Sequence, residues 1–131
     1  MPLDCHIDHS RRVVVATAYG AVSIEEWAAC LAKQIRDGGW GYATLFDFSG
    51  AESLPPIESL PKIAGDVEEL AAEHGPRGPV ALLANPRLFE HVRRYSDMAM
   101  RLPFQTAVFS DKAAAEAWVE RYAREIKSRS T

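Results

Sequence analysis

Short apolar runs, separated by longer stretches with helical periodicity, dominate the pattern of this 131-residue chain. Residues 42–48 and 80–84 are largely apolar and end in turn formers, which is typical of buried strands in an α/β sheet. Residues 5–9 alternate weakly between polar and apolar positions, and residues 12–19 contain three consecutive valines. These two segments flank a short polar turn and therefore predict an opening antiparallel hairpin. A last strand is predicted over residues 104–109.

Four segments between and after these strands carry apolar residues at the spacing of a helix. The first begins at a capping box formed by Ser23 and Glu26 and ends at a glycine pair. The second runs from about residue 61 to residue 73. The third begins at Asn85-Pro86, ends at about residue 101 and is stopped by Pro103, and the fourth begins after Ser110-Asp111. The side chains predicted to face the core are Ile24, Trp27, Ala28, Leu31 and Ile35; Ile63, Val67 and Leu70; Leu88, Val92, Tyr95 and Ala99; and Ala114, Trp118, Tyr122 and Ile126.

The element order is therefore β-β-α-β-α-β-α-β-α. It predicts a single α/β domain over residues 1–131, with one mixed, mostly parallel sheet of about five strands and four main helices. The hairpin is expected to supply the antiparallel strand.

Composition narrows the function classes. A formal net charge of −3 argues against a nucleic-acid binder, and no run approaches the length of a membrane span. The N-terminus lacks the basic-then-apolar order of a signal peptide. Cys5 and Cys30 fit neither a disulfide framework nor a four-ligand zinc site. We therefore expect a cytoplasmic protein with reduced thiols and no cofactor.

Residues 45–50, Leu-Phe-Asp-Phe-Ser-Gly, resemble the central strand of STAS domains, the fold of anti-sigma-factor antagonists. Residues 107–111 and the helix after them resemble the last strand and helix of SpoIIAA-like proteins of the STAS/SEC14-like group. This resemblance covers nearly the whole chain. It implies a SpoIIAA-like fold, a cytoplasmic bacterial-type setting, and a non-enzymatic regulatory module that binds a protein partner or self-associates. Since related SEC14-like domains carry lipids, it also implies an alternative, the binding of a small apolar ligand.

Ligands of parallel sheets gather at the carboxyl ends of the strands, which directs attention to the loop over residues 49–60. Asp47 and Ser49 lie where the central strand enters this loop. They either make a polar contact in a cleft or, more commonly for such residues, satisfy the turn itself. A partial groove under this loop and the helix that begins at Pro86 is the predicted place for an apolar ligand.

Antagonist-type STAS domains carry a phosphorylated serine, preceded by aspartate, a few residues after the central strand. Here Pro55-Pro56 occupies that place, and neither Ser53 nor Ser59 follows an aspartate. Both serines also lie in a loop with two glutamates, so added phosphate would meet like charge. We therefore predict that serine phosphorylation does not switch this protein.

Arg87, Arg94 and Arg101 recur every seven residues and predict one arginine-lined helix face. Such a face suits a phosphate or a phospholipid head group. Acidic residues at four-residue spacing favour the other interpretation, a solvated face that is internally neutralised. The expected pairs are Glu90–Arg94, Arg93–Asp97 and Asp97–Arg101.

Asp4, His6 and Asp8 share one face of the first strand and have the chemistry of metal ligands. A polar edge strand is the commoner cause of such a pattern, so no metal site is predicted. Nucleophile elbow, phosphate loop and His-Glu-x-x-His motifs are all missing from the sequence. An enzyme with an unrecognised site is thus the least favoured alternative.

The aromatic residues divide into two sets. Trp27, Phe104, Phe109 and Trp118 fit core positions. The second set either fills the core as well, which we favour, or leaves an apolar groove near the strand ends. Its members are Trp40, Tyr42, Phe48, Phe89, Met98 and Met100.

Overall fold

A computed structural model describes residues 2–99, 101–102 and 104–129 of the chain, with side chains described as far as residue 126. Its order of main strands and helices matches the predicted one, and two short strands, β3 and β5, are additional. The elements are β1 (Leu3–Asp8), β2 (Val13–Ala18), β3 (Gly20–Ala21), α1 (Ile24–Arg36), β4 (Ala43–Phe48), β5 (Ala51–Ser53), the 3-10 turn η1 (Ile57–Ser59), α2 (Leu60–His74), β6 (Val80–Ala84), α3 (Phe89–Ala99), β7 (Thr106–Phe109) and α4 (Lys112–Arg129).

Within the described residues, five strands form one mixed sheet in the order β1-β2-β4-β6-β7. The pair β1 and β2 is antiparallel, whereas β2, β4, β6 and β7 run parallel to one another. The predicted mixed α/β sheet with an antiparallel hairpin strand is thus confirmed. A second, parallel pair of strands, β3 and β5, lies beside the carboxyl end of the sheet.

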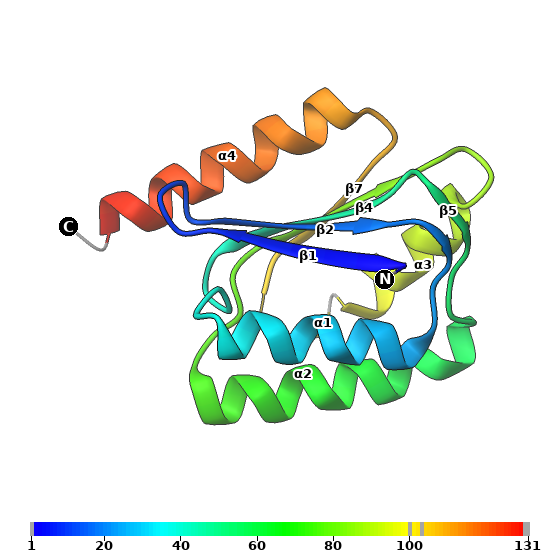
Figure 1. Ribbon diagram of the computed structural model, residues 1–131, viewed down its shortest axis with the longest axis horizontal. Coiled ribbons are helices and arrows are strands. Elements are labelled where there is room, and N and C mark those ends of the chain that lie inside the picture. The colour runs from blue at the N-terminus through cyan, green and yellow to red at the C-terminus, as the bar shows by residue number, and fades with distance from the viewer. Residues whose placement is uncertain (1, 100, 103, 130–131) are drawn as a thin grey trace.

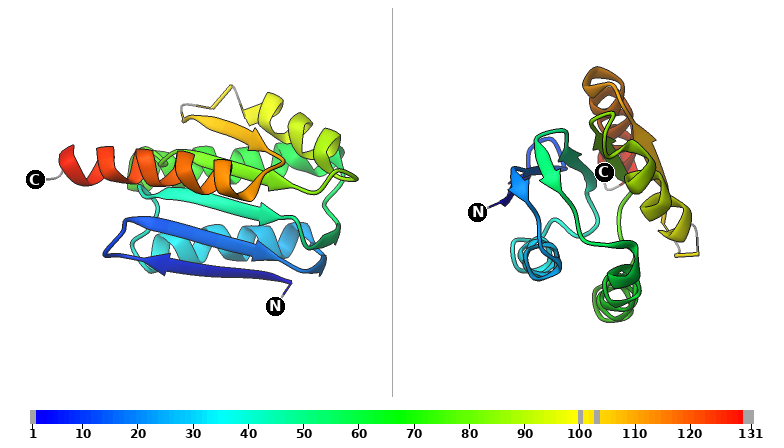
Figure 2. Two further views of the ribbon diagram at one scale, coloured as in Figure 1. Left: turned by 90° about the horizontal axis from the view of Figure 1, so that it is seen from above. Right: turned by 90° about the vertical axis from the view of Figure 1, so that its right-hand side faces the viewer.

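Helices cover both faces of the sheet. Figure 1 shows α1 and α2 under one face and α4 across the other, and Figure 2 shows α3 beside α2 and β7. Because both faces are covered, all six residues of β4 are buried. Successive side chains of β4 alternate: Phe46 and Phe48 point toward α1–α3, and Leu45 points toward α4.

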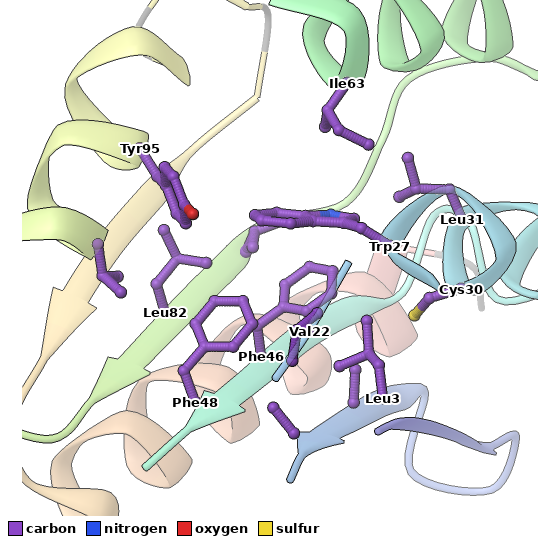
Figure 3. Packing of buried hydrophobic residues seen from close by; sticks show 14 of the residues in the cluster. Leu3, Val22, Trp27, Cys30, Leu31, Phe46, Phe48, Ile63, Leu82 and Tyr95 are labelled. Atoms are coloured by element: carbon purple, nitrogen blue, oxygen red, sulfur yellow. The ribbon is translucent and has the colours of Figure 1, made fainter. Parts of the chain in front are cut away.

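The larger part of the core lies between the sheet and α1–α3, and aromatic rings dominate it. The indole of Trp27 reaches from α1 over the strands, as Figure 3 shows, with ring centroids 5.6 Å from Phe46, 5.6 Å from Phe48 and 5.3 Å from Tyr95. Tilted and edge-on aromatic contacts of this kind add to the stabilisation that burial alone provides. The prediction of a core position for Trp27 is confirmed, and Trp40 and Phe48 of the second aromatic set are also buried.

The inner face of α4 differs from the prediction by one position. Ala115, Val119 and Ala123 are the buried residues that face the sheet, whereas Ala114 is exposed and Trp118, with two other predicted residues, packs beside them at partial burial. Small side chains allow the helix to approach the strands closely. The periodicity predicted the helix correctly. The prediction of its inner face was wrong because it followed the large apolar residues instead of the small ones.

The third helix also begins later than predicted. Asn85 accepts a hydrogen bond from Leu88 N at 3.0 Å, but it caps a turn over residues 86–88, and α3 begins only at Phe89. The last strand, β7, begins at Thr106. Pro103, the predicted helix stop, lies outside the described residues, as does Met100 of the second aromatic set.

Candidate ligand-binding groove

An apolar groove with a volume of about 640 Å³ lies between α2 and α3, on the face of the sheet that α1 also covers. Figure 3 labels six side chains of its wall, which are Trp27, Leu31, Phe46, Ile63, Leu82 and Tyr95. Its volume and apolar lining are those of small-molecule sites in proteins. The apolar residues that line it are Trp27, Leu31, Phe46, Leu60, Pro61, Ile63, Ala64, Val67, Val80, Leu82, Tyr95, Met98, Ala99, Leu102 and Phe104.

The position of the groove differs from the expected one. It lies along α2 and α3 and includes the first residue of β6 and the first residue of β7, Val80 and Thr106. Of the expected loop over residues 49–60, only Leu60 takes part in the lining. Met98 is the one described member of the second aromatic set that lines it.

The wall of this apolar groove includes a buried cationic side chain, Arg77. Only 7% of the residue's surface is exposed. Its guanidinium carbon lies 4.6 Å from the ring centroid of Trp40, 5.9 Å from that of Phe46 and 5.8 Å from that of Phe104. Since Phe46 and Phe104 both line the groove, the charged end of Arg77 lies on the groove side of its loop.

The loop between α2 and β6 holds Arg77 in place through its backbone. Trp40 Nε1 donates to Gly75 O at 2.9 Å, and Gly78 N donates to Trp40 O at 3.1 Å. A Cβ atom at Gly78 would lie 2.2 Å from Tyr42 O, so this close approach of two backbones requires glycine. Trp40 therefore holds the backbone of the loop both before and after Arg77.

Within the part of the chain that the structure describes, Arg77 makes one hydrogen bond to a side chain, from Nη1 to Gln34 Oε1 at 2.9 Å. Among the described residues, no carboxylate forms an ion pair with it; the ion pairs found there join other residues. Burial lowers the pKa of Arg77 to about 10, so the group still carries its charge at neutral pH. A buried cation whose single side-chain partner is a neutral amide is uncommon in protein interiors.

Behind Arg77, two thiols of α1 and β1 complete a polar cluster. Gln34 Nε2 donates to Cys30 Sγ at 3.9 Å, and both Cys5 and Cys30 are free and buried. The hydrogen bond between the two thiols lowers the pKa of Cys5 and, together with burial, raises the pKa of Cys30. The sequence offered no sign that these cysteines lie together.

Asp47 and Ser49, predicted at the end of the central strand, bond to each other. Asp47 Oδ1 accepts hydrogen bonds from Ser49 N at 3.0 Å and from Ser49 Oγ at 2.5 Å, and Asp47 Oδ2 lies 3.9 Å from Lys112 Nζ. Lys112 is the first residue of α4, so this pair lies across the sheet from the groove. The geometry is that of a self-satisfied turn.

The other predicted site residues spread over the surface near β5 and α3. Arg87 Nη2 donates to Glu52 O at 2.6 Å, and Ser53 is exposed in β5. Ser59 Oγ donates to Pro56 O at 2.7 Å and does not cap α2. Arg94 is exposed on α3. None of these predicted residues lines the groove.

The predicted arginine face does not form as one stripe, because Arg87 precedes α3 and bonds to β5. On α3, the predicted pair of Arg93 and Asp97 is present at 3.8 Å. Glu90 pairs with Arg93 at 2.7 Å and not with Arg94 as predicted, and the predicted pair of Asp97 and Arg101 is not found among the described residues. On β1, Asp8 accepts from Ser10 Oγ at 2.8 Å. Nowhere in the described part of the chain do three or more His, Cys, Asp or Glu side chains cluster as a metal site.

The fold and the groove together define a domain with a SpoIIAA-like fold that has an apolar site on its three-helix face. The chain is similar in structure to an uncharacterised protein of the DUF3478 family with a SpoIIAA-like fold from Shewanella loihica PV-4. The TM-score is 0.59 at 19% identity, over 89% of this chain and 93% of that one. It is also similar to an anti-sigma factor antagonist from Mycobacterium paratuberculosis, with a TM-score of 0.56 at 16% identity and the same two coverages.

These likenesses confirm the predicted SpoIIAA-like fold. No family model matches the sequence, and no curated protein matches it significantly. Within the residues that the structure describes, no helix is both long and apolar enough to cross a membrane.

Proposed function

We propose that this protein is a non-enzymatic regulatory module that binds a small apolar molecule in the groove between α2 and α3. The observation that supports this proposal most is the groove itself, an apolar space of about 640 Å³ beside a packed core. Sites for small ligands in proteins range from about 300 to 1,000 Å³ and are mostly apolar, with a few polar groups that orient the ligand. We place this activity in the cytoplasm, where both thiols stay reduced.

The chemistry of the groove wall supports binding better than catalysis. The hydroxyl of Tyr95 donates to Pro55 O and also lies 3.0 Å from His91 Nε2. Burial raises the pKa of Tyr95 far above neutrality, so this phenol neither gives up nor takes a proton under cellular conditions. Arg77 stays protonated for the reason given above and supplies no general base.

A neutral fluorescent probe tests the proposal. We expect N-phenyl-1-naphthylamine to bind one equivalent of the protein with increased fluorescence, because its rings are apolar and uncharged. Replacing Ala64, a half-buried residue of the groove wall, by phenylalanine should fill part of the groove and weaken probe binding about tenfold or more. The matched control is Ala117→Phe on the exposed face of α4, which should leave probe binding unchanged. Equal binding by both variants, or no binding to the wild type, would contradict the proposal.

A second candidate function is a protein contact at the carboxyl end of the sheet, which the likeness to an anti-sigma factor antagonist supports at the level of fold. The specific observation in its favour is Tyr19, a large apolar side chain that is 57% exposed beside β3. If a second copy of the chain covers it, light scattering at increasing concentration should show a dimer that Tyr19→Ser weakens. A monomer at all concentrations would exclude this self-association.

A further inference from the structure

The charge of Arg77 is not balanced within the described residues. Gln34, its one side-chain partner, is neutral, and Trp40 covers one face of the guanidinium without neutralising it. Buried charges in folded proteins are normally paired, because an isolated one loses its hydration without compensation. Arg77 therefore has the properties of half an ion pair.

The guanidinium has donors left for a partner. It carries five N–H groups in one plane, and the bond to Gln34 uses one of its nitrogens. Among the described residues the guanidinium makes no other hydrogen bond. Arg77 lines the groove of about 640 Å³ and also a second cavity of about 260 Å³.

We propose that the groove binds an amphipathic monocarboxylate, with its apolar body between α2 and α3 and its carboxylate paired with Arg77. This inference rests on the proposed function and names the class of ligand. The planar guanidinium matches a carboxylate with two parallel hydrogen bonds. The apolar side chains around it match a hydrocarbon or aromatic body, and desolvation by such a body strengthens the ion pair.

The charges around the groove favour a single negative charge over two. Glu68, Asp97 and Arg101 are the ionisable residues that line the groove besides Arg77, and all three are exposed at its rim. Inside the groove, the single positive charge of Arg77 balances one carboxylate. A phosphate monoester carries a second negative charge, which would lie without a partner near the two acidic residues of the rim. The smaller cavity, of about 260 Å³, is bordered by Glu125, which would repel a carboxylate there.

Matched ligands test the head group without any variant. Decanoate and 1-decanol have the same chain and differ in charge. By displacement of N-phenyl-1-naphthylamine at pH 7, we expect decanoate to bind the wild type about tenfold to a hundredfold more tightly than decanol. Lengthening the carboxylate should strengthen binding about fourfold per methylene until the groove is filled. Decyl phosphate should bind more weakly than decanoate.

Two variants locate the charge that matters. Arg77→Met should remove the advantage of decanoate over decanol while probe binding persists, whereas Arg101→Met, at the rim, should keep that advantage. Far-ultraviolet circular dichroism confirms that each variant is folded. If Arg77→Met does not fold, the comparison of decanoate with decanol on the wild type still tests whether the groove prefers a carboxylate.

The outcomes separate the two proposals. If the probe and decanol bind and decanoate binds no better, or if decyl phosphate binds best, the inference about Arg77 is wrong and the apolar groove stands. Loss of the decanoate advantage in Arg101→Met instead of Arg77→Met also overturns the inference. If neither the probe nor any decyl ligand binds, the proposed function itself fails.

Discussion

The buried charge of Arg77 should lower the free energy of unfolding, and this effect can be measured. The perturbation is the double variant Arg77→Met and Gln34→Leu, which replaces the guanidinium and its neutral partner together by apolar groups. Changing both partners matters because Arg77→Met alone leaves the amide of Gln34 buried without the hydrogen bond that it now accepts. An unsatisfied buried group costs about 1–3 kcal/mol, which would mask the effect of removing the charge.

The magnitude follows from the burial of Arg77. Its pKa of about 10 lies below the ordinary value for arginine by an amount that corresponds to about 3 kcal/mol of unfavourable desolvation. Against this stand the stacking of the guanidinium on Trp40, worth about 2 kcal/mol in a desolvated site, and its hydrogen bond to Gln34, worth about 1 kcal/mol. Methionine recovers part of the loss through its own contacts with the aromatic rings, about 1 kcal/mol. The free energy of unfolding of the double variant should therefore be about 1 kcal/mol higher than that of the wild type.

Urea denaturation followed by circular dichroism measures this difference, provided that all variants share one slope against urea concentration. The single variant Arg77→Met should be about 1–3 kcal/mol less stable than the double variant. Arg101→Met, an exposed change at the rim, should stay within about 0.5 kcal/mol of the wild type. A double variant that is about 2 kcal/mol or more less stable than the wild type would show that Arg77 stabilises the fold and is a structural residue.

Three further predictions follow from the described contacts. Leu45→Asp should prevent folding, since a lone charge in a strand buried on both faces costs several kcal/mol; cooperative unfolding of this variant by circular dichroism would contradict it. Gly78→Ala should lower the melting temperature, because its Cβ atom would lie 2.2 Å from a backbone carbonyl oxygen, whereas the control Gly65→Ala, which meets nothing within 4 Å, should raise the free energy of unfolding by up to about 1 kcal/mol. Ser53→Asp and Ser59→Asp should leave probe binding and oligomeric state unchanged, because the serine switch is not expected; phosphopeptides from native cells at either serine, with altered binding by the Asp variant, would overturn this.

The fold was accessible from the sequence because its signals are local. Apolar runs such as residues 80–84, capping boxes such as that of Ser23 and Glu26, and turn formers between them fix the type and order of the elements. Details that depend on packing were less accessible. The inner face of α4 follows Ala115 and Val119, since close approach to the sheet selects small residues, and periodicity alone favoured the larger Trp118.

Such local signals could predict neither the groove nor the burial of Arg77. Arg77 lies in the sequence Gly-Pro-Arg-Gly-Pro, which predicts an exposed loop with a solvated charge. Its burial results from contacts with Trp40 and Gln34, more than 30 residues away in the chain. Attention to the carboxyl ends of the strands led instead to Asp47 and Ser49, which bond to each other. Position at a strand end indicates where ligands commonly bind but does not say which face of the sheet holds a cavity.

Methyl NMR with N-phenyl-1-naphthylamine can show whether the groove between α2 and α3 is the ligand site, because the rings of this probe shift nearby methyl signals strongly and report where it lies. We expect saturable shifts at the methyl groups of Ile63, Val67 and Leu82, which border the groove, and none at Leu45 of β4 and Val119 of α4, which pack together on the opposite face of the sheet. Shifts under α4, or no saturable shifts at all, would contradict the assignment of the groove as the ligand site.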